Sequence, residues 1–213
     1  MIQSIKKFLK LRLKKKLPGM SAQDKMSPIS VFDGMYKNSK TKDVNIGSVL
    51  IIFYSINKQL YFPLIERTKN VKYHSKQISF PGGKFEENDK NLSYTAIRET
   101  KEEIGLIPSN LELLGSLTKL YIPASNFEIT PFIAIHENKP DFKLNKREVY
   151  NLIEVPLKKI LDKRNIFKKK MKLSIGKTLD CPFYNLNGYI VWGATAMILS
   201  ELSIILKKKY DYE

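Results

Sequence analysis

The chain has little cysteine and little histidine, and it has far fewer acidic than basic residues. A single cysteine, Cys181, excludes an internal disulfide, and it suits a chain that folds in the reducing cytosol. We therefore expect a cytoplasmic protein. Because there is no second cysteine and no Cys-His spacing, Cys181 is interpreted as a small buried apolar residue.

Long apolar runs are also absent. No segment reaches the roughly 18 apolar residues that a membrane-spanning helix requires. The first 16 residues contain seven basic side chains and no apolar core of the kind that a secretory signal carries. We expect neither a membrane span nor a secretory signal.

Basic charge is abundant: 37 Lys and Arg against 21 Asp and Glu give a net charge of +16. Such a charge attracts polyanions at long range, but it does not distinguish nucleic acid, anionic lipid and phosphorylated metabolites. The charge gathers in two runs, at residues 6–16 and 158–172. Runs of this kind are usually solvated faces.

The length and the 43% hydrophobic content indicate one domain, which we place at residues 21–213 after an N-terminal extension of residues 1–20. Ile2, Ile5, Phe8 and Leu9 recur at helical spacing, so residues 2–16 are predicted to form a basic amphipathic helix. Docking of this helix on the body of the domain is favoured, because a single apolar stripe commonly covers a core. Contact with a membrane surface is the alternative.

The remaining pattern predicts a layered α/β (α+β) domain with a mixed sheet. Residues 20–44 are expected to be an irregular arm, and residues 46–54 and 59–67 a hairpin turning at Asn57-Lys58. A helix at 93–103, closed by Gly105, follows. The further expected elements are strands at 111–120, 129–135, 149–155, 173–175, 183–186 and 189–191, and helices at 157–162 and 193–208.

The helix at 93–103 carries the most informative residues of the chain. Glu99, Glu102 and Glu103 fall at i, i+3 and i+4, so three carboxylates share one helix face. Like charges at this spacing destabilise a helix by a few tenths of a kcal/mol per pair, roughly, and they call for compensating charge. A hard divalent cation is the natural compensation, and such cations point to phosphate chemistry.

The segment Arg98-Glu99-Thr100-Lys101-Glu102-Glu103-Ile104-Gly105-Leu106 resembles the second half of the signature of the Nudix hydrolases, with Thr100 in place of the usual apolar residue. The resemblance implies a Nudix-type mixed β-sheet sandwiched between helices. Gly83 lies 15 positions before Arg98, one more than in the general signature, and Asp89 stands near the usual glutamate. We expect Asp89 to shape this longer loop.

The longer loop is similar to that of the coenzyme A diphosphatase branch of the family. The preceding residues agree: Arg67-Thr68, then His74-Ser75-Lys76-Gln77-Ile78-Ser79-Phe80-Pro81-Gly82-Gly83, with Lys76 where the branch often has glycine. Similarity extends to Val191-Trp192-Gly193-Ala194-Thr195-Ala196 and covers about residues 22–206.

The resemblance implies roles for individual residues. Glu99, Glu102, Glu103 and the carbonyl of Gly82 would bind Mg²⁺ or Mn²⁺, and Arg98 would orient a metal-binding glutamate. Glu99 and Glu148 are both candidates for the general base. Arg67, His74 and Lys76 are expected to contact substrate, whereas His136 is expected to be structural. Gly82 and Gly83 suit close approach of the backbone to metal or phosphate.

Three functions remain open from the sequence. The first is metal-dependent cleavage of coenzyme A or acyl-CoA into adenosine 3′,5′-bisphosphate and 4′-phosphopantetheine. The second keeps the chemistry but takes ADP-ribose, a dinucleotide or a nucleoside triphosphate. The third is a basic Nudix-like binding protein for nucleic acid or membrane, against which the intact glutamates argue. No specific nucleic acid is expected, and the oligomeric state is left open.

Overall fold

The computed structural model describes residues 1–28, 43–68, 77–172 and 178–210. The expected strand at 173–175 lies outside these ranges. The helices are α1 (Ile2–Arg12), α2 (Met20–Gln23), α3 (Leu92–Ile104), α4 (Lys158–Leu161) and α5 (Gly193–Tyr210), with short 3₁₀ turns η1 (Asp24–Met26), η2 (Pro108–Asn110), η3 (Pro123–Ser125) and η4 (Lys163–Asn165). The strands are β1 (Asn45–Ile56), β2 (Gln59–Arg67), β3 (Ile78–Ser79), β4 (Gly82–Lys84), β5 (Leu111–Ser116), β6 (Leu120–Ile122), β7 (Phe127–His136), β8 (Val149–Pro156), β9 (Ile166–Lys172), β10 (Thr178–Leu186) and β11 (Tyr189–Trp192).

The central sheet has the strand order β3-β2-β1-β7-β5, with β4 added to β1, β6 to β7 and β8 to β2. It is mixed, because β1 and β7 run parallel while the other pairs are antiparallel. A second, antiparallel sheet has the order β11-β10-β9. The predicted hairpin is confirmed: Ile56 pairs with Gln59 across Asn57 and Lys58. Both turn residues have positive φ, as the two-residue turns that match strand twist require.

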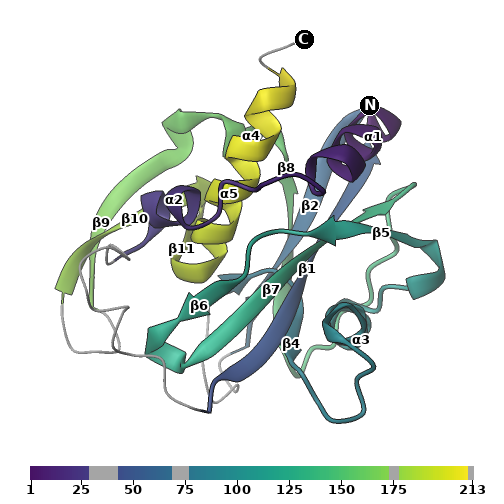
Figure 1. The fold of residues 1–213 in the computed structure, drawn as a ribbon, viewed down its shortest axis with the longest axis horizontal. Helices are drawn as coiled ribbons and strands as arrows, with labels where there is room; N and C mark the ends of the chain where they lie inside the picture. Colours follow the sequence, from purple (N-terminus) through teal and green to yellow (C-terminus); the bar gives the residue numbers. More distant parts are fainter. Residues whose placement is uncertain (29–42, 69–76, 173–177, 211–213) are drawn as a thin grey trace.

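Strand β1 is buried on both faces of the central sheet, which explains its continuous apolar run. Leu50 and Ile52 pack toward α3, together with Ala96 and Ile104 of that helix. Ile51 and Phe53 belong to the larger core on the opposite face, which α1 and α5 cover. Figure 1 shows α3 on one side of the sheet and α5 on the other. The predicted layered fold with a mixed sheet between helices is therefore confirmed.

Helix α1 packs on the body of the molecule, with Ile5 and Leu9 fully buried. It ends at Arg12 rather than at residue 16. The prediction of an irregular arm is wrong at its start, since α2 and η1 form within residues 20–26 and bury Ala22 and Met26. Helix α2 is short, and contacts with α5 stabilise it rather than a local sequence pattern. The division into an extension and a domain stays a prediction.

One further expectation differs from the structure. The strand predicted at 111–120 is broken into β5, which ends at Ser116, and β6, which begins at Leu120, and β5 itself contains a register shift against β7 between Leu113 and Gly115. Leu117 then donates its N–H to the carbonyl of Pro131, 2.8 Å away, before β6 begins. The lysine-rich residues of β9 form a strand through pairing with β10. Across the described ranges no helix has both the length and the apolarity needed to cross a bilayer.

Candidate active site

Helix α3 fixes the three glutamates. Asn91 caps its N-terminus by accepting the N–H of Tyr94 at 2.9 Å, and Gly105 ends it in the left-handed conformation, with φ of 70°. Thr100 sits on the buried face, where its hydroxyl donates to the carbonyl of Ala96 at 2.6 Å. This internal hydrogen bond satisfies the polar residue that stands at the usual apolar position.

The glutamates differ in exposure. The side chain of Glu103 is 1% exposed, that of Glu99 is 15% exposed and that of Glu102 is 51% exposed. The face of α3 that carries them therefore runs from the protein interior to the surface. A polyanionic ligand approaching from solvent would meet Glu102 first and Glu103 last.

Glycines 82 and 83 lie directly against this helix face. The N–H of Gly82 donates to Glu103 Oε2 at 2.9 Å. A Cβ on Gly83 would lie 2.3 Å from Glu99 Cδ, so the space that a side chain needs is already taken by the carboxylate. Gly82 has φ of 147°, in the range that favours glycine, and its own Cβ would meet the carbonyl of Ser48 at 2.3 Å. Gly82 therefore requires glycine, whereas a side chain at Gly83 would have to displace the carboxylate of Glu99.

Arg67 supports Glu103 from β2. Its Nη1 donates to Glu103 Oε1 at 2.9 Å, while Gly82 holds the other oxygen. Burial raises the pKa of Glu103 to about 7, although Arg67 and the Gly82 N–H act in the opposite direction. The structure thus brings Arg67 and Gly82 together with one of the three glutamates.

Arg98 joins the loop after β4 to the glutamate face. Its Nε and Nη2 donate to the two oxygens of Asp89 at 2.8 and 3.0 Å. Its Nη1 donates to Glu99 at 3.0 Å and to Glu102 at 3.2 Å. Arg98 is therefore placed to orient two glutamates at once.

Asp89 is the anchor of that arginine. Its side chain is 2% exposed, and it also accepts the N–H of Glu86 at 3.0 Å and the hydroxyl of Thr95 at 2.9 Å. The hydrogen bonds from Arg98 hold the pKa of Asp89 well below its usual range. The expected loop-shaping contacts are present, but the pairing with Arg98 was missed, because it links a loop to a helix nine residues later and leaves no local pattern.

Burial also raises the pKa of Glu99, while the charge of Arg98 acts to lower it. Repulsion from Glu148 contributes to raising the pKa of both Glu99 and Glu103. Glu148 is therefore close enough to act on the glutamate face electrostatically, although it lies 45 positions after Glu103 in the sequence.

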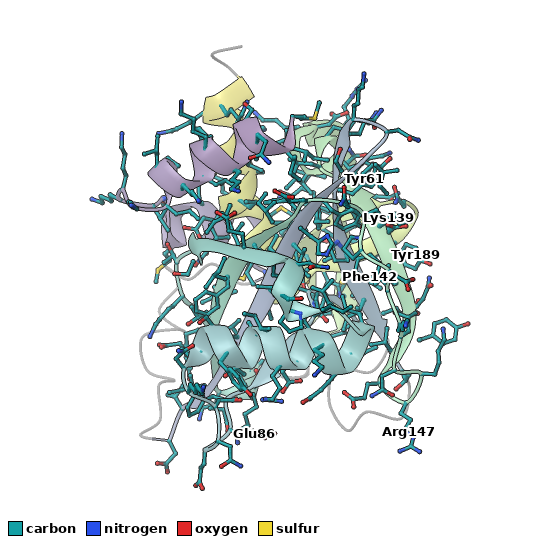
Figure 2. The ribbon with its side chains drawn as sticks, turned by 90° about the vertical axis from the view of Figure 1, so that its right-hand side faces the viewer. Tyr61, Glu86, Lys139, Phe142, Arg147 and Tyr189 are labelled. Atoms are coloured by element: carbon teal, nitrogen blue, oxygen red, sulfur yellow. The ribbon has the colours of Figure 1, made fainter. Side chains whose placement is uncertain are left out.

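The loop that carries Glu148 is attached to the end of α3. The N–H of Lys143 donates to the carbonyl of Ile104 at 2.8 Å, and that of Asn145 donates to the carbonyl of Glu103 at 2.9 Å. Asn145 Nδ2 donates in turn to Glu148 Oε1 at 3.2 Å. Figure 2 shows Arg147 extending away from the body at this corner, below the level of α3. Asn145 is a positioning residue that the sequence did not reveal.

A second feature missed in the sequence is a β-bulge beside this loop. Glu66 pairs with Asn151 and Arg67 with Val149, so Tyr150 has no partner on β2. Tyr150 is 68% exposed. Bulges are over-represented next to active sites, where they redirect a side chain. The bulge lies opposite Arg67 and two residues from Glu148.

Two other predicted site residues, His74 and Lys76, lie outside the described residues. His136 is buried and its Nδ1 is 2.6 Å from the carbonyl of Asn138, which fits the structural role expected for it.

The donor set suits a hard divalent cation, since it consists of carboxylate oxygens, and the Gly82 carbonyl as a further ligand stays a prediction. Among the described residues, however, no three His, Cys, Asp or Glu side chains converge as a ready metal cluster. The contacts explain why: Arg98 binds Glu99 and Glu102, whereas Glu103 turns to Gly82 and Arg67. Cation binding would compete with the contacts of Arg98.

Comparison with known proteins places these residues in a family context. A family model described as NUDIX domain matches residues 45–172, a range that includes all the candidate residues. An uncharacterized Nudix hydrolase NudL of Pectobacterium atrosepticum is 31% identical over 144 residues, which cover 66% of this chain and 72% of that protein. Nudix hydrolase 15, mitochondrial, of Arabidopsis thaliana is 32% identical over 183 residues, which cover 83% of this chain and 62% of that protein.

Solved structures show the same fold. The crystal structure of the Nudix hydrolase RenU from M. smegmatis superposes with a TM-score of 0.54 at 13% identity, covering 76% of this chain and 85% of that chain. A MutT/nudix family protein from Enterococcus faecalis gives a TM-score of 0.50 at 15% identity, over 90% of this chain and 73% of that chain.

Proposed function

This chain belongs to the Nudix family, and from that membership we propose that it hydrolyses the diphosphate linkage of coenzyme A or acyl-CoA with Mg²⁺ or Mn²⁺. The observation that carries the proposal is the contact between α3 and β4. There, the carboxylates of Glu99 and Glu103 lie against two glycines that have no room for side chains, and two arginines hold these carboxylates and that of Glu102 in place. Such a site presents oxygen ligands to a cation and backbone to a phosphate.

In this proposal Glu99, Glu102, Glu103 and the carbonyl of Gly82 hold the divalent ion. When bound, that ion neutralises charge on the diphosphate and lowers the pKa of a coordinated water. Asp89 holds Arg98 so that its guanidinium aligns Glu99 and Glu102. Gly82 and Arg67 fix both oxygens of Glu103.

We propose Glu148 as the general base. Glu99, the other candidate, already accepts a hydrogen bond from Arg98. Among the described residues, Glu148 accepts from the neutral amide of Asn145 rather than from a cationic side chain, and this contact orients the carboxylate. In the proposed step the proton of the attacking water passes to Glu148, the water oxygen bonds to phosphorus, and the bridging P–O bond breaks, so that the bridging oxygen and the electron pair leave with the other phosphate.

The choice of coenzyme A rests on the segment before α3. The residues from Arg67 to Gly83 and the additional loop residue resemble the coenzyme A diphosphatase branch. The contacts of Asp89 support this choice of substrate, because the longer loop places Asp89 where it binds Arg98. His74, Lys76 and the remaining N–H groups of Arg67 are proposed to face the phosphates of the substrate.

A substrate panel tests the proposal. The purified chain, with Mg²⁺ or Mn²⁺, is given coenzyme A, an acyl-CoA, ADP-ribose, a dinucleotide and a nucleoside triphosphate, and the products are separated by chromatography. We expect 4′-phosphopantetheine and adenosine 3′,5′-bisphosphate to form fastest. A faster reaction with ADP-ribose, the dinucleotide or the triphosphate would favour the second function, and no turnover with either metal would overturn hydrolysis altogether.

A second test is the variant Glu102→Gln, which removes one charge from the exposed end of the glutamate face. If this face stabilises charge through a cation, we expect a loss of several hundred-fold in kcat, on the order of the loss of one strong electrostatic contact. A loss below about tenfold would contradict the assigned role of Glu102.

A further inference from the structure

Three basic segments that are far apart in the sequence lie toward one end of the molecule. They are α1 with the residues after it, the α4–η4 segment and the last turn of α5. Both views place these segments in the upper part of the molecule and α3 in the lower half (Figures 1 and 2). We define the basic end by Lys7, Lys14, Lys15, Lys16, Lys158, Lys159, Lys163, Arg164, Lys207 and Lys208.

The lysines of helix α1 face solvent, because its apolar stripe packs against the body of the molecule. Ile5 and Leu9 are fully buried against the body. Lys6 and Lys10 both pair with Glu112, so the helix is fixed in rotation as well as docked. Lys7 and Lys14–Lys16 are exposed.

The α4–η4 segment is also anchored to the body of the molecule by a buried apolar side chain. Ile160 of α4 is 1% exposed and packs into the core beside α5. Lys158, Lys159, Asp162, Arg164 and Asn165 line a surface hollow. Its one acid, Asp162, is bound by Arg164 at 2.8 Å, which leaves the two lysines of the hollow in excess. The last turn of α5 adds Lys207 and Lys208 and contains no acid.

The exposed apolar residues of α1 distinguish between polyanionic partners. Met1 is 65% exposed and Leu11 is 60% exposed, and both are aliphatic. Single-stranded nucleic acid is bound by aromatic side chains on which bases stack. An anionic bilayer instead attracts each nearby Lys or Arg and accepts aliphatic side chains at its headgroup boundary. The combination found at the basic end fits a lipid surface.

We infer that the basic end docks the protein on an anionic membrane surface. The lysines of the three segments contact lipid headgroups, and Met1 and Leu11 enter the interface. Docking in this orientation leaves α3 and the glutamate face turned away from the bilayer, so the candidate active site stays open. The inference does not depend on the proposed substrate.

Co-sedimentation with vesicles tests the inference on the full chain. Vesicles of phosphatidylcholine alone are compared with vesicles of phosphatidylcholine and phosphatidylserine, at low and at high salt. We expect binding only to the anionic vesicles, and weaker binding as salt rises. Binding to neither, or equally to both, would overturn the inference.

A charge-reversal variant tests the location. Lys7→Glu, Lys14→Glu and Lys208→Glu together change exposed residues of two segments. We expect the vesicle partition coefficient to fall by at least about 100-fold, since each charge near the surface contributes several-fold. The matched control is Lys90→Glu, Lys101→Glu and Lys146→Glu, three exposed lysines beside α3 and its loops, with the same change in net charge.

The two variants separate a local surface from general charge. An equal loss in both would mean that net charge alone drives binding, and it would overturn the inference. Circular dichroism confirms that each variant is folded. A fluorescent single-stranded oligonucleotide is titrated in parallel; if it displaces the protein from vesicles and its affinity falls in the same variant only, the basic end is a nucleic-acid surface and the inference fails.

Discussion

At the scale of single residues, the site depends on side chains outside the proposed set of metal ligands. Asp89 holds Arg98, and Arg98 aligns two glutamates. A carboxylate that is 2% exposed costs free energy to desolvate, and the bidentate pair with arginine offsets this cost. The arrangement of Glu99 and Glu102 therefore depends on Asp89, which acts on them through Arg98.

Replacing Asp89 with Asn removes the charge while keeping the shape. Breaking such a pair leaves Arg98 without its main partner, and we expect a loss of about 3 kcal/mol in the free energy of unfolding at neutral pH. Urea unfolding of both proteins, without added metal, measures it. A difference below about 0.5 kcal/mol would contradict the anchoring role.

The same pair predicts how the difference depends on pH. The folded pKa of Asp89 is lowered by Arg98, so its contribution is fully present above the unfolded value of about 3.9. It is lost as pH falls from that value through the lower folded pKa. The stability gap between the wild type and Asp89→Asn should therefore be constant near neutrality and shrink in acid. A difference in the free energy of unfolding that grew below about pH 4 would contradict the lowered pKa of Asp89.

At the scale of elements, the site is the junction of a turn, a helix and a loop. Strand β4 brings its glycines against α3, and the loop at 143–148 is bonded to the last carbonyls of the same helix. Because α3 is capped at both ends, its terminal turns do not fray, and both the turn and the loop contact a fixed helix. Relative placement of the glutamates and Glu148 is thus set by backbone contacts.

Gly83→Ala tests this junction. The φ of Gly83 is not positive, so alanine fits the backbone, but its Cβ would lie 2.3–2.6 Å from the carboxylate of Glu99. We expect kcat to fall by about 100-fold as Glu99 is displaced, with the melting temperature little changed. Steady-state kinetics and thermal unfolding are measured together. Activity close to the wild type would mean that Glu99 has room to move without consequence.

At the scale of the whole molecule, one buried carboxylate closes the fold. Glu201 of α5 is fully buried and accepts from the N–H of Gly19 at 2.9 Å, from Gln23 at 3.1 Å and from Thr118 at 2.6 Å. It ties the N-terminal segment, the middle of the chain and the final helix together. Residues 19–23 are therefore an integral part of the packed body.

Glu201→Ala should leave three donors without their acceptor, two of them, those of Gly19 and Gln23, on buried residues. We expect a loss of about 3 kcal/mol or more in the free energy of unfolding, from the desolvation of these groups. Denaturant unfolding followed by Trp192 fluorescence measures the change. Glu87→Ala, at an exposed position, is the control and should differ from the wild type by less than about 0.5 kcal/mol. An equal effect of the two substitutions would contradict the closing role of Glu201.

The sequence predicted what local pattern determines. The hairpin at Asn57-Lys58 and helix α3 follow from apolar periodicity, turn chemistry and capping, and the glutamate face follows from helical spacing. Strand β9 could not be predicted in this way, because its run of lysines has no strand pattern and it is a strand only through pairing with β10. The partners of Asp89 and Glu201 depend in the same way on distant residues.

The contact between Gly19 and Glu201 joins residues 182 positions apart. During synthesis on the ribosome, residues 19–23 emerge long before α5 and cannot make their contacts with Glu201 until α5 has been made. Ile5 and Leu9 lie in a lysine-rich segment, and they stay uncovered until β1 and β5, the strands that α1 contacts, have been made. Apolar surface exposed in this way is prone to aggregate, and this part of the fold closes only once α5 has been made.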